Sequence, residues 1–205
     1  DTTASLGPGW AHGFEQQITE GEHVITLREA EGREVRFARI LVGGSTFHRR
    51  ERMTLHRDGP SSYRVERSKD RRTLSFAATR EGGPAKLRAI RDAWDNALTL
   101  DHDGERLTRV TDTAGRELKI LWKESRIVRI ELRASGGLEQ WVDYAYSTAG
   151  CLTGVIDALG GTEEYEYDRF RRMTAATIKT GVRFQYEYEA NTGRCRKTWG
   201  PKGLY

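Results

Sequence analysis

Three tyrosine pairs at a fixed spacing constrain the fold of this 205-residue chain more than any other feature. Each pair has the form Tyr-x-Tyr, and each begins 21 residues after the one before it. The pairs are Tyr144 and Tyr146, Tyr165 and Tyr167, and Tyr186 and Tyr188. A period near 20 residues means that one supersecondary unit is copied along the chain. We therefore expect a repeat architecture.

The stretch from Leu107 to Trp122 indicates what one unit is. A short β-prone run ends at Asp112, and Gly115 follows where a turn needs a left-handed residue. Beyond the turn, inward-facing apolar residues alternate with mostly polar ones, which is typical of a strand with one buried face. Each unit is therefore predicted to be a strand, a glycine turn and a second strand.

One sequence frame recurs along the chain: an apolar residue, a second apolar residue three positions later, and an Asp two positions after that. It begins at Leu87, Leu107 and Leu152. Its turn positions hold Asp92 with Asp95-Asn96, Asp112 with Gly115, Asp157 with Gly160, and Gly181. Each Asp that precedes a turn is predicted to accept backbone N–H bonds in an Asx-type turn, which is a structural role.

Two stretches fit this frame less well. A weak copy begins at Ile127, has Leu132 where Asp is expected and ends at Gly136-Gly137. The stretch from Pro84 to Leu98 has apolar residues at helical spacing, and read alone it predicts a helix. Because its apolar residues also match the frame at Leu107, we favour the repeat over the helix.

With these motifs the chain resembles the YD-repeat, or Rhs, family. The segment Tyr165-Glu166-Tyr167-Asp168 and the run from Leu152 to Gly160 match the repeat of that family, and the segment from Leu6 to His12 resembles the start of its shells. Departures occur at Arg171 and Arg172, where Gly-Arg is expected. The resemblance covers most of the chain.

The resemblance implies an all-β fold in which antiparallel β-hairpin repeats form a spiralling sheet, part of a YD-repeat shell. Residues 1–82 would be the N-terminal hairpin segment of the shell, and residues 83–205 would hold about four to five repeats. Whole proteins of this family wind such sheets into a hollow cocoon. The cocoon encloses a C-terminal toxin in bacterial members, and animal members serve in cell-surface adhesion.

The function implied by the resemblance is a non-enzymatic scaffold that encapsulates a toxin for interbacterial competition. Its partners would be the remainder of its own polypeptide, the enclosed toxin domain and secretion-system components, and it would be secreted or delivered to a target cell. Both ends look cut from a longer protein, since the chain stops in mid-repeat at Tyr205. Unpaired strand edges at such ends are expected to favour self-association.

Charge and hydropathy exclude several other classes of protein. The net charge is +4, from 34 Lys and Arg against 30 Asp and Glu, and acidic residues are interleaved with the basic ones. Nucleic-acid binding normally needs a clustered basic stripe, so we interpret the basic clusters as solvated strand faces and turns. No apolar run is long enough to span a membrane, and no targeting signal is visible.

The cysteines and histidines form no recognisable site for chemistry. Cys151 and Cys195 lie too far apart in sequence for a metal-ligand motif, and we expect both to fill the core, with a disulfide between stacked units as the alternative. His12 and His102 are the only histidines with suggestive neighbours, and a hydrolase built on either is the least favoured hypothesis. No catalytic, cofactor-binding or metal-binding residue is predicted.

The tyrosine pairs offer the remaining functional option. Their equal places in consecutive units predict two ladders, one through Tyr144, Tyr165 and Tyr186 and one through Tyr146, Tyr167 and Tyr188. We expect these ladders to line the sheet or its core. The alternative function is a carbohydrate- or protein-binding module at the cell surface that uses an exposed tyrosine stripe.

Overall fold

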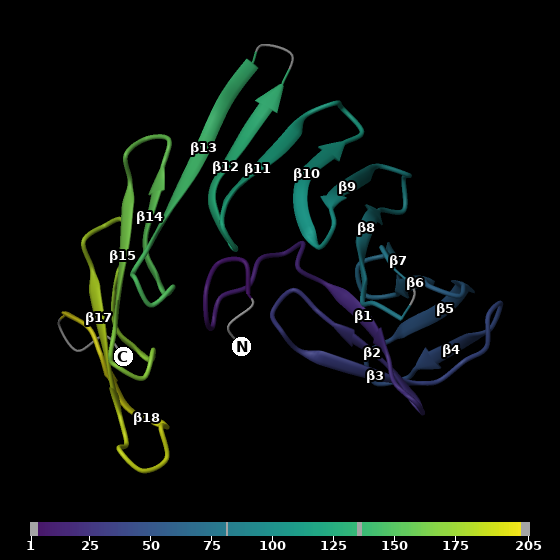
Figure 1. Ribbon diagram of the computed structural model, residues 1–205, viewed down its shortest axis with the longest axis horizontal. Helices are drawn as coiled ribbons and strands as arrows, with labels where there is room; N and C mark the ends of the chain where they lie inside the picture. Colours follow the sequence, from purple (N-terminus) through teal and green to yellow (C-terminus); the bar gives the residue numbers. More distant parts are fainter. Residues whose placement is uncertain (1–3, 81, 135–136, 202–205) are drawn as a thin grey trace. The chain divides into compact units, whose positions relative to one another are not determined.

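The computed structural model describes residues 4–80, 82–134 and 137–201 (Figure 1). Its strands belong to one sheet of 18 strands, and every strand pairing that it describes is antiparallel. The described residues contain no α-helix. The all-β class with antiparallel hairpins is therefore confirmed.

The strands follow one another along the chain with short connections. The first nine are β1 (Gln17–Glu20), β2 (Val24–Arg28), β3 (Glu34–Ala38), β4 (Ser45–His48), β5 (Met53–Gly59), β6 (Ser62–Arg67), β7 (Arg72–Ala78), β8 (Ala85–Arg91) and β9 (Ala97–Asp103). The second nine are β10 (Arg106–Asp112), β11 (Glu117–Lys123), β12 (Arg126–Ala134), β13 (Gly137–Tyr146), β14 (Leu152–Asp157), β15 (Thr162–Tyr167), β16 (Met173–Thr177), β17 (Arg183–Tyr188) and β18 (Cys195–Trp199).

The chain divides into two compact units, which we name by their contents. The core unit holds the described residues of 11–120 and 132–137, and the tyrosine unit holds those of 1–10, 121–131 and 138–205. The predicted boundary between residues 82 and 83 lies in the connection from β7 to β8, and both of these strands belong to the core unit. That the YD repeats start at residue 83 thus stays a prediction, which rests on the sequence motifs alone.

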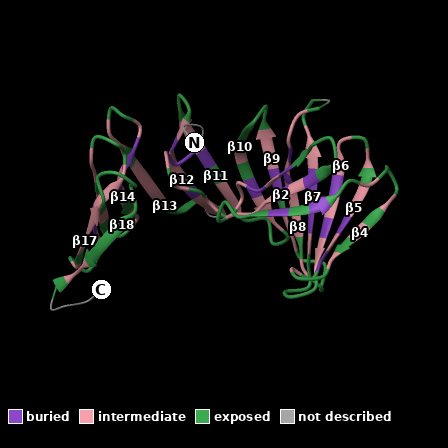
Figure 2. Ribbon diagram, turned by 90° about the horizontal axis from the view of Figure 1, so that it is seen from below, coloured by how far each residue is buried: buried purple, intermediate pink, exposed green. Residues whose placement is uncertain are grey.

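The core unit encloses most of the buried apolar side chains. Its strand β1 is hydrogen-bonded to β2 along one edge and to β8 along the other, which brings the start of the unit against a strand about 70 residues later. Each of the strands β5 to β7 buries two alternate side chains, and Figure 2 shows these buried positions as purple bands. Rows such as Tyr63, Phe76 and Leu87, paired across β6, β7 and β8, form the core.

The stretch from Pro84 to Leu98 is not a helix. It forms β8, a turn and the start of β9, as the repeat frame predicted. The helical spacing of its apolar residues does not mark one buried face. Leu87 is buried, whereas Trp94 lies at the turn and is 74% exposed.

One turn geometry recurs at many hairpins. The residue that opens the turn donates its N–H to the carbonyl four positions later, and its own carbonyl accepts the N–H three positions later, as at Asp112, Asp157 and Asp168. The fourth residue then has a positive φ, which is +81° at Gly115. Arg171 replaces glycine at this place and adopts a φ of +62°.

The weak third copy lacks this turn. Strand β12 continues through Leu132 to Ala134, because Leu132 has no carboxylate with which to open an Asx turn. Of the predicted ending at Gly136-Gly137, Gly136 lies outside the described residues, and Gly137 begins β13 with a φ of +107°.

Candidate functional site: the tyrosine face

The six paired tyrosines project from alternate strands of the tyrosine unit. They lie on β13, β15 and β17, and the two members of a pair are two residues apart, so they share one side of the sheet. All six are half-buried. We call this side of the sheet the tyrosine face.

The predicted pair of straight ladders is wrong in its register. Tyr144 pairs with Val155, which in turn pairs with Glu163. Tyr165 therefore lies two residues beyond the level of Tyr144. The next step is the same, because Tyr165 pairs with Ala176 and Ala176 with Phe184, two residues before Tyr186. The tyrosines thus form a diagonal stripe, which is the stagger that curled sheets adopt.

The second tyrosine of each pair lies opposite a β-bulge. The register shifts where Tyr146 pairs with Leu152, where Tyr167 pairs with Met173, and where Tyr188 pairs with Cys195. These bulges were missed from the sequence. The extra residue follows the partner of the second tyrosine, and it is Thr153, Thr174 or Arg196.

Two of these tyrosines tie the strands together through their hydroxyl groups. The hydroxyl of Tyr146 donates to the carbonyl of Ile127 at 2.6 Å, and that of Tyr188 donates to the carbonyl of Met173 at 2.7 Å. The hydroxyl of Tyr165 donates instead to the carboxylate of Glu163 at 2.7 Å. Each hydroxyl keeps its lone pairs available to accept a further bond.

The segment of residues 4–10 lies against the tyrosine unit and ends on a tyrosine pair. The carbonyl of Ser5 accepts a bond from the N–H of Ile127 at 3.0 Å. Gly7 approaches so closely that an added Cβ would lie 2.8 Å from the carbonyl oxygen of Gly150. The segment therefore requires glycine at this position.

Trp10 completes the contact of this segment. Its ring centroid lies 4.7 Å from that of Tyr165, and its Nε1–H donates to the hydroxyl oxygen of Tyr167 at 2.8 Å. The sequence alone did not identify these tyrosines as the partners of Trp10. We call this arrangement the Trp10 site.

Burial makes the phenols of the tyrosine face harder to ionise. It raises the pKa of Tyr144, Tyr146, Tyr165 and Tyr167, so these phenols remain neutral at physiological pH. Burial also raises the pKa of Tyr188. A neutral phenol is a poor base and a poor nucleophile, so this face offers stacking and hydrogen bonding rather than acid–base chemistry.

The opposite face of the same strands is charged. The guanidinium of Arg183 forms two bonds, of 2.7 and 2.8 Å, with the carboxylate of Glu166 on the neighbouring repeat. Arg196 and Glu187 form a further pair. Such exposed pairs add little stability, and their main effect is to keep this face hydrated.

The Asp residues at the turns make the bonds predicted for them. Oδ1 of Asp112 accepts the N–H groups of Ala114 and Arg116, both at 2.9 Å. The equivalent bonds occur at Asp92, Asp157 and Asp168. Burial favours the neutral form of Asp168, but the backbone N–H and the guanidinium of Arg172 outweigh it and hold its pKa below the usual value. These carboxylates shape turns.

The two candidate histidines lie in the core unit. Burial lowers the pKa of His12, against the opposing charge of Glu15. Burial, together with the nearby Arg88, lowers the pKa of His102 to about 4. At both histidines burial outweighs the nearby carboxylate, which is Glu15 at His12 and Glu105 at His102. The described residues hold no group of three or more metal-ligating side chains.

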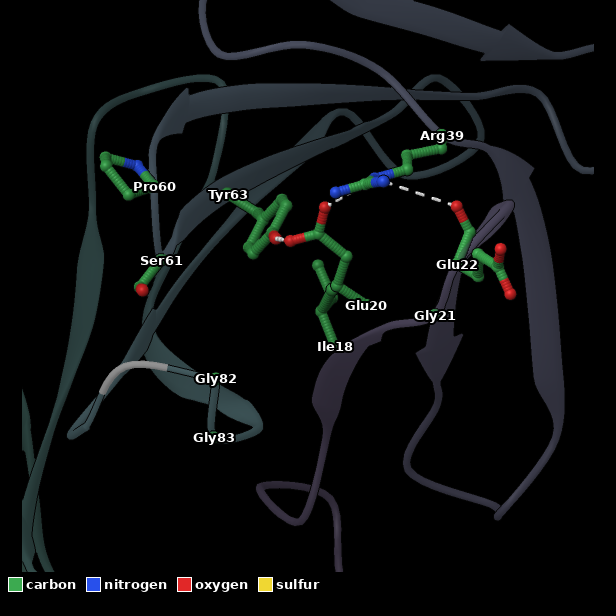
Figure 3. Close-up of a pocket in the computed structure, with 10 residues that line it drawn as sticks. All are labelled: Ile18, Glu20, Gly21, Glu22, Arg39, Pro60, Ser61, Tyr63, Gly82 and Gly83. Atoms are coloured by element: carbon green, nitrogen blue, oxygen red, sulfur yellow. Dashed lines mark hydrogen bonds and ion pairs between the residues drawn. The ribbon is translucent and has the colours of Figure 1, made fainter.

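A polar pocket of the core unit was not foreseen. It has a volume of about 330 Å³ and contains Glu20, which accepts bonds from Arg39 at 2.9 Å and from Tyr63 at 2.9 Å (Figure 3). Glu20 also accepts a bond from Arg57 at 2.8 Å. Burial opposes ionisation of Glu20, but Arg39 and Tyr63 lower its pKa. Because three donors occupy the carboxylate of Glu20, we interpret the pocket as a structural junction.

The prediction for the cysteines is correct for one of them. Cys151 is buried as expected, whereas Cys195 is exposed, and both thiols are free. The core prediction for Cys195 is wrong because β18 has no further strand beside it among the described residues, so nothing covers this position. The alternative of a disulfide is also wrong.

Comparison with known proteins gives only distant likenesses. No family model and no curated protein matches the chain. The crystal structure of TcdB2-TccC3-TEV is 15% identical with a TM-score of 0.32, covering 90% of this chain and 11% of that chain. The crystal structure of TcdB2-TccC3 is 12% identical with a TM-score of 0.34, covering 91% and 14%. The chain thus spans a small fraction of these structures. Among the described residues, no helix is long and apolar enough to cross a membrane.

Proposed function

We propose that this chain is a non-enzymatic wall segment of a YD-repeat shell, which surrounds a polypeptide cargo and helps to deliver it to a target cell. The observation that carries the proposal is the division of the tyrosine unit into a face with a tyrosine pair in each repeat and an opposite face with ion pairs. By the resemblance of the repeats, the cargo is a toxin domain at the C-terminal end of the same polypeptide.

The two faces suit opposite sides of a wall. The charged face keeps its ion pairs in water, as an outer surface requires for solubility. The tyrosine face offers aromatic rings and phenolic hydroxyl groups without a continuous apolar patch, because all six tyrosines are partly buried. Such a lining can hold an unfolded chain weakly at many points.

The experiment that tests the proposal is to translate the coding sequence beyond Tyr205, express the whole product and digest it with a protease. We expect further Tyr-Asp repeats, followed by an unrelated last domain that resists digestion while the repeats are intact. The same last domain expressed alone is the control, and it should be cleaved. A stop codon within a few residues, or equal cleavage of the domain in both forms, would overturn the proposal.

A further inference from the structure

The Trp10 site is one of three equivalent places on the tyrosine face. The pair Tyr165 and Tyr167 holds the indole of Trp10 by a ring contact and a hydrogen bond. The pair Tyr186 and Tyr188 occupies the same place one repeat later, on β17. The contact that Tyr165 and Tyr167 make with an indole is therefore a guide to what Tyr186 and Tyr188 can bind.

The second place differs from the first in its aromatic contact. At the first, the ring of Tyr165 contacts that of Trp10. Among the described residues, Tyr186 makes no ring contact.

The chemical requirements of the first place are met at the second. The hydroxyl of Tyr188 donates its proton to the carbonyl of Met173, so its oxygen is available to accept an indole N–H, as that of Tyr167 does. We propose that Tyr186 and Tyr188 form a binding site for a tryptophan side chain on an extended segment of the enclosed polypeptide. This inference, which we call the Tyr186 site, rests on the proposed function.

The repeat also specifies a residue before that tryptophan. Gly7, three positions before Trp10, contacts the turn at Gly150 and Cys151. One repeat later, this turn carries Arg171 and Arg172 instead. Arg172 is paired with Asp168, but Arg171 is exposed and makes no ion pair among the described residues. The bound segment is therefore expected to carry an acidic residue three positions before its tryptophan.

The test uses the 205-residue chain labelled with ¹⁵N and a blocked peptide Asp-Pro-Gly-Trp. We expect the peptide to shift the amide signals of Tyr186, Tyr188 and Thr198. A Trp-to-Leu peptide should bind at least about tenfold more weakly, because it lacks the ring contact and the N–H donor. A Gly-Pro-Gly-Trp peptide should bind several-fold more weakly, and Arg171→Gly should remove that preference.

Variants of the chain complete the design. Tyr186→Leu should lose binding, whereas Tyr186→Phe, which keeps the ring, should retain it and shows that the fold is intact. Trp94→Ala removes an exposed tryptophan of the core unit and should change nothing. Trp10→Ala vacates the first place, so the peptide should then also shift the signals of Tyr165 and Tyr167.

The inference is overturned if up to about 5 mM peptide shifts no amide signal of β17, because the dissociation constant would then be well above the millimolar range. Equal binding of the Trp and Leu peptides would overturn it as well. Either result, obtained while the last domain of the whole product still resists protease, removes the Tyr186 site and leaves the wall function standing.

Discussion

The core unit and the tyrosine unit are built from the same hairpins but are stabilised differently. The core unit closes β1 against β8 and buries rows of Leu, Val and Phe between its strands. The tyrosine unit has few fully buried side chains and relies on half-buried tyrosines, turn carboxylates and the segment of residues 4–10. Hairpin repeats thus do not need a large buried core if hydrogen bonds from tyrosine hydroxyls and from turn residues link each strand to the next.

The largest expected effect would come from the core unit. Phe76 is 2% exposed and pairs with Tyr63 and Leu87, so Phe76→Ala should lower the free energy of unfolding by about 3–5 kcal/mol. Native-state hydrogen exchange would measure it, with loss of protection at the amides of β6 and β7. Equal loss at β15 to β17 would contradict the separation of the two units.

The tyrosine unit should be most sensitive at its covering segment. Gly7→Ala forces a side chain into a φ of +97° and against the carbonyl of Gly150, which should cost about 2 kcal/mol. The indole N–H signal of Trp10 would report the loss of its bond to Tyr167. Gly9→Ala is the matched control, because its φ is +81° but nothing lies near its Cβ, so it should cost less.

A single hydroxyl should matter less. Tyr146→Phe removes the bond to the carbonyl of Ile127 and should lower the free energy of unfolding by about 1 kcal/mol, as measured by urea denaturation. Tyr144→Phe removes a hydroxyl with no hydrogen bond among the described residues and should be close to neutral. If the two variants proved equally stable, the hydrogen bonds of tyrosine hydroxyls would not be what stabilises the tyrosine unit.

The smallest effect should be a gain. Arg171 has a φ of +62°, so Arg171→Gly should stabilise the tyrosine unit by about 0.5 kcal/mol, the balance between relieved strain and the greater freedom of glycine when unfolded. The melting temperature of Arg169→Gly, changed in the same turn at a residue without positive φ, provides the comparison. A loss of stability in Arg171→Gly would show that this side chain has a contact worth more than its strain.

The turns and the repeat could be predicted from the sequence because they depend on local chemistry. Asp112 and Gly115 specify their turn within five residues, and the same reasoning separated strand from helix at Pro84. The bulges, the stagger of the tyrosine pairs and the position of Trp10 depend on pairing between strands, which no local pattern encodes. Glu20 was missed for the same reason, since its partners lie 19 to 43 residues away.

The bulge in each repeat has a consequence for how such a chain can lengthen. Without it, Tyr144 would be level with Gly154 and then with Glu164, and Tyr165 would point to the charged side. The extra residue restores the parity that an odd repeat of 21 residues would break. Duplication or deletion of whole repeats in the gene therefore leaves every tyrosine on its original side, so evolution can change the number of repeats without turning the sheet inside out.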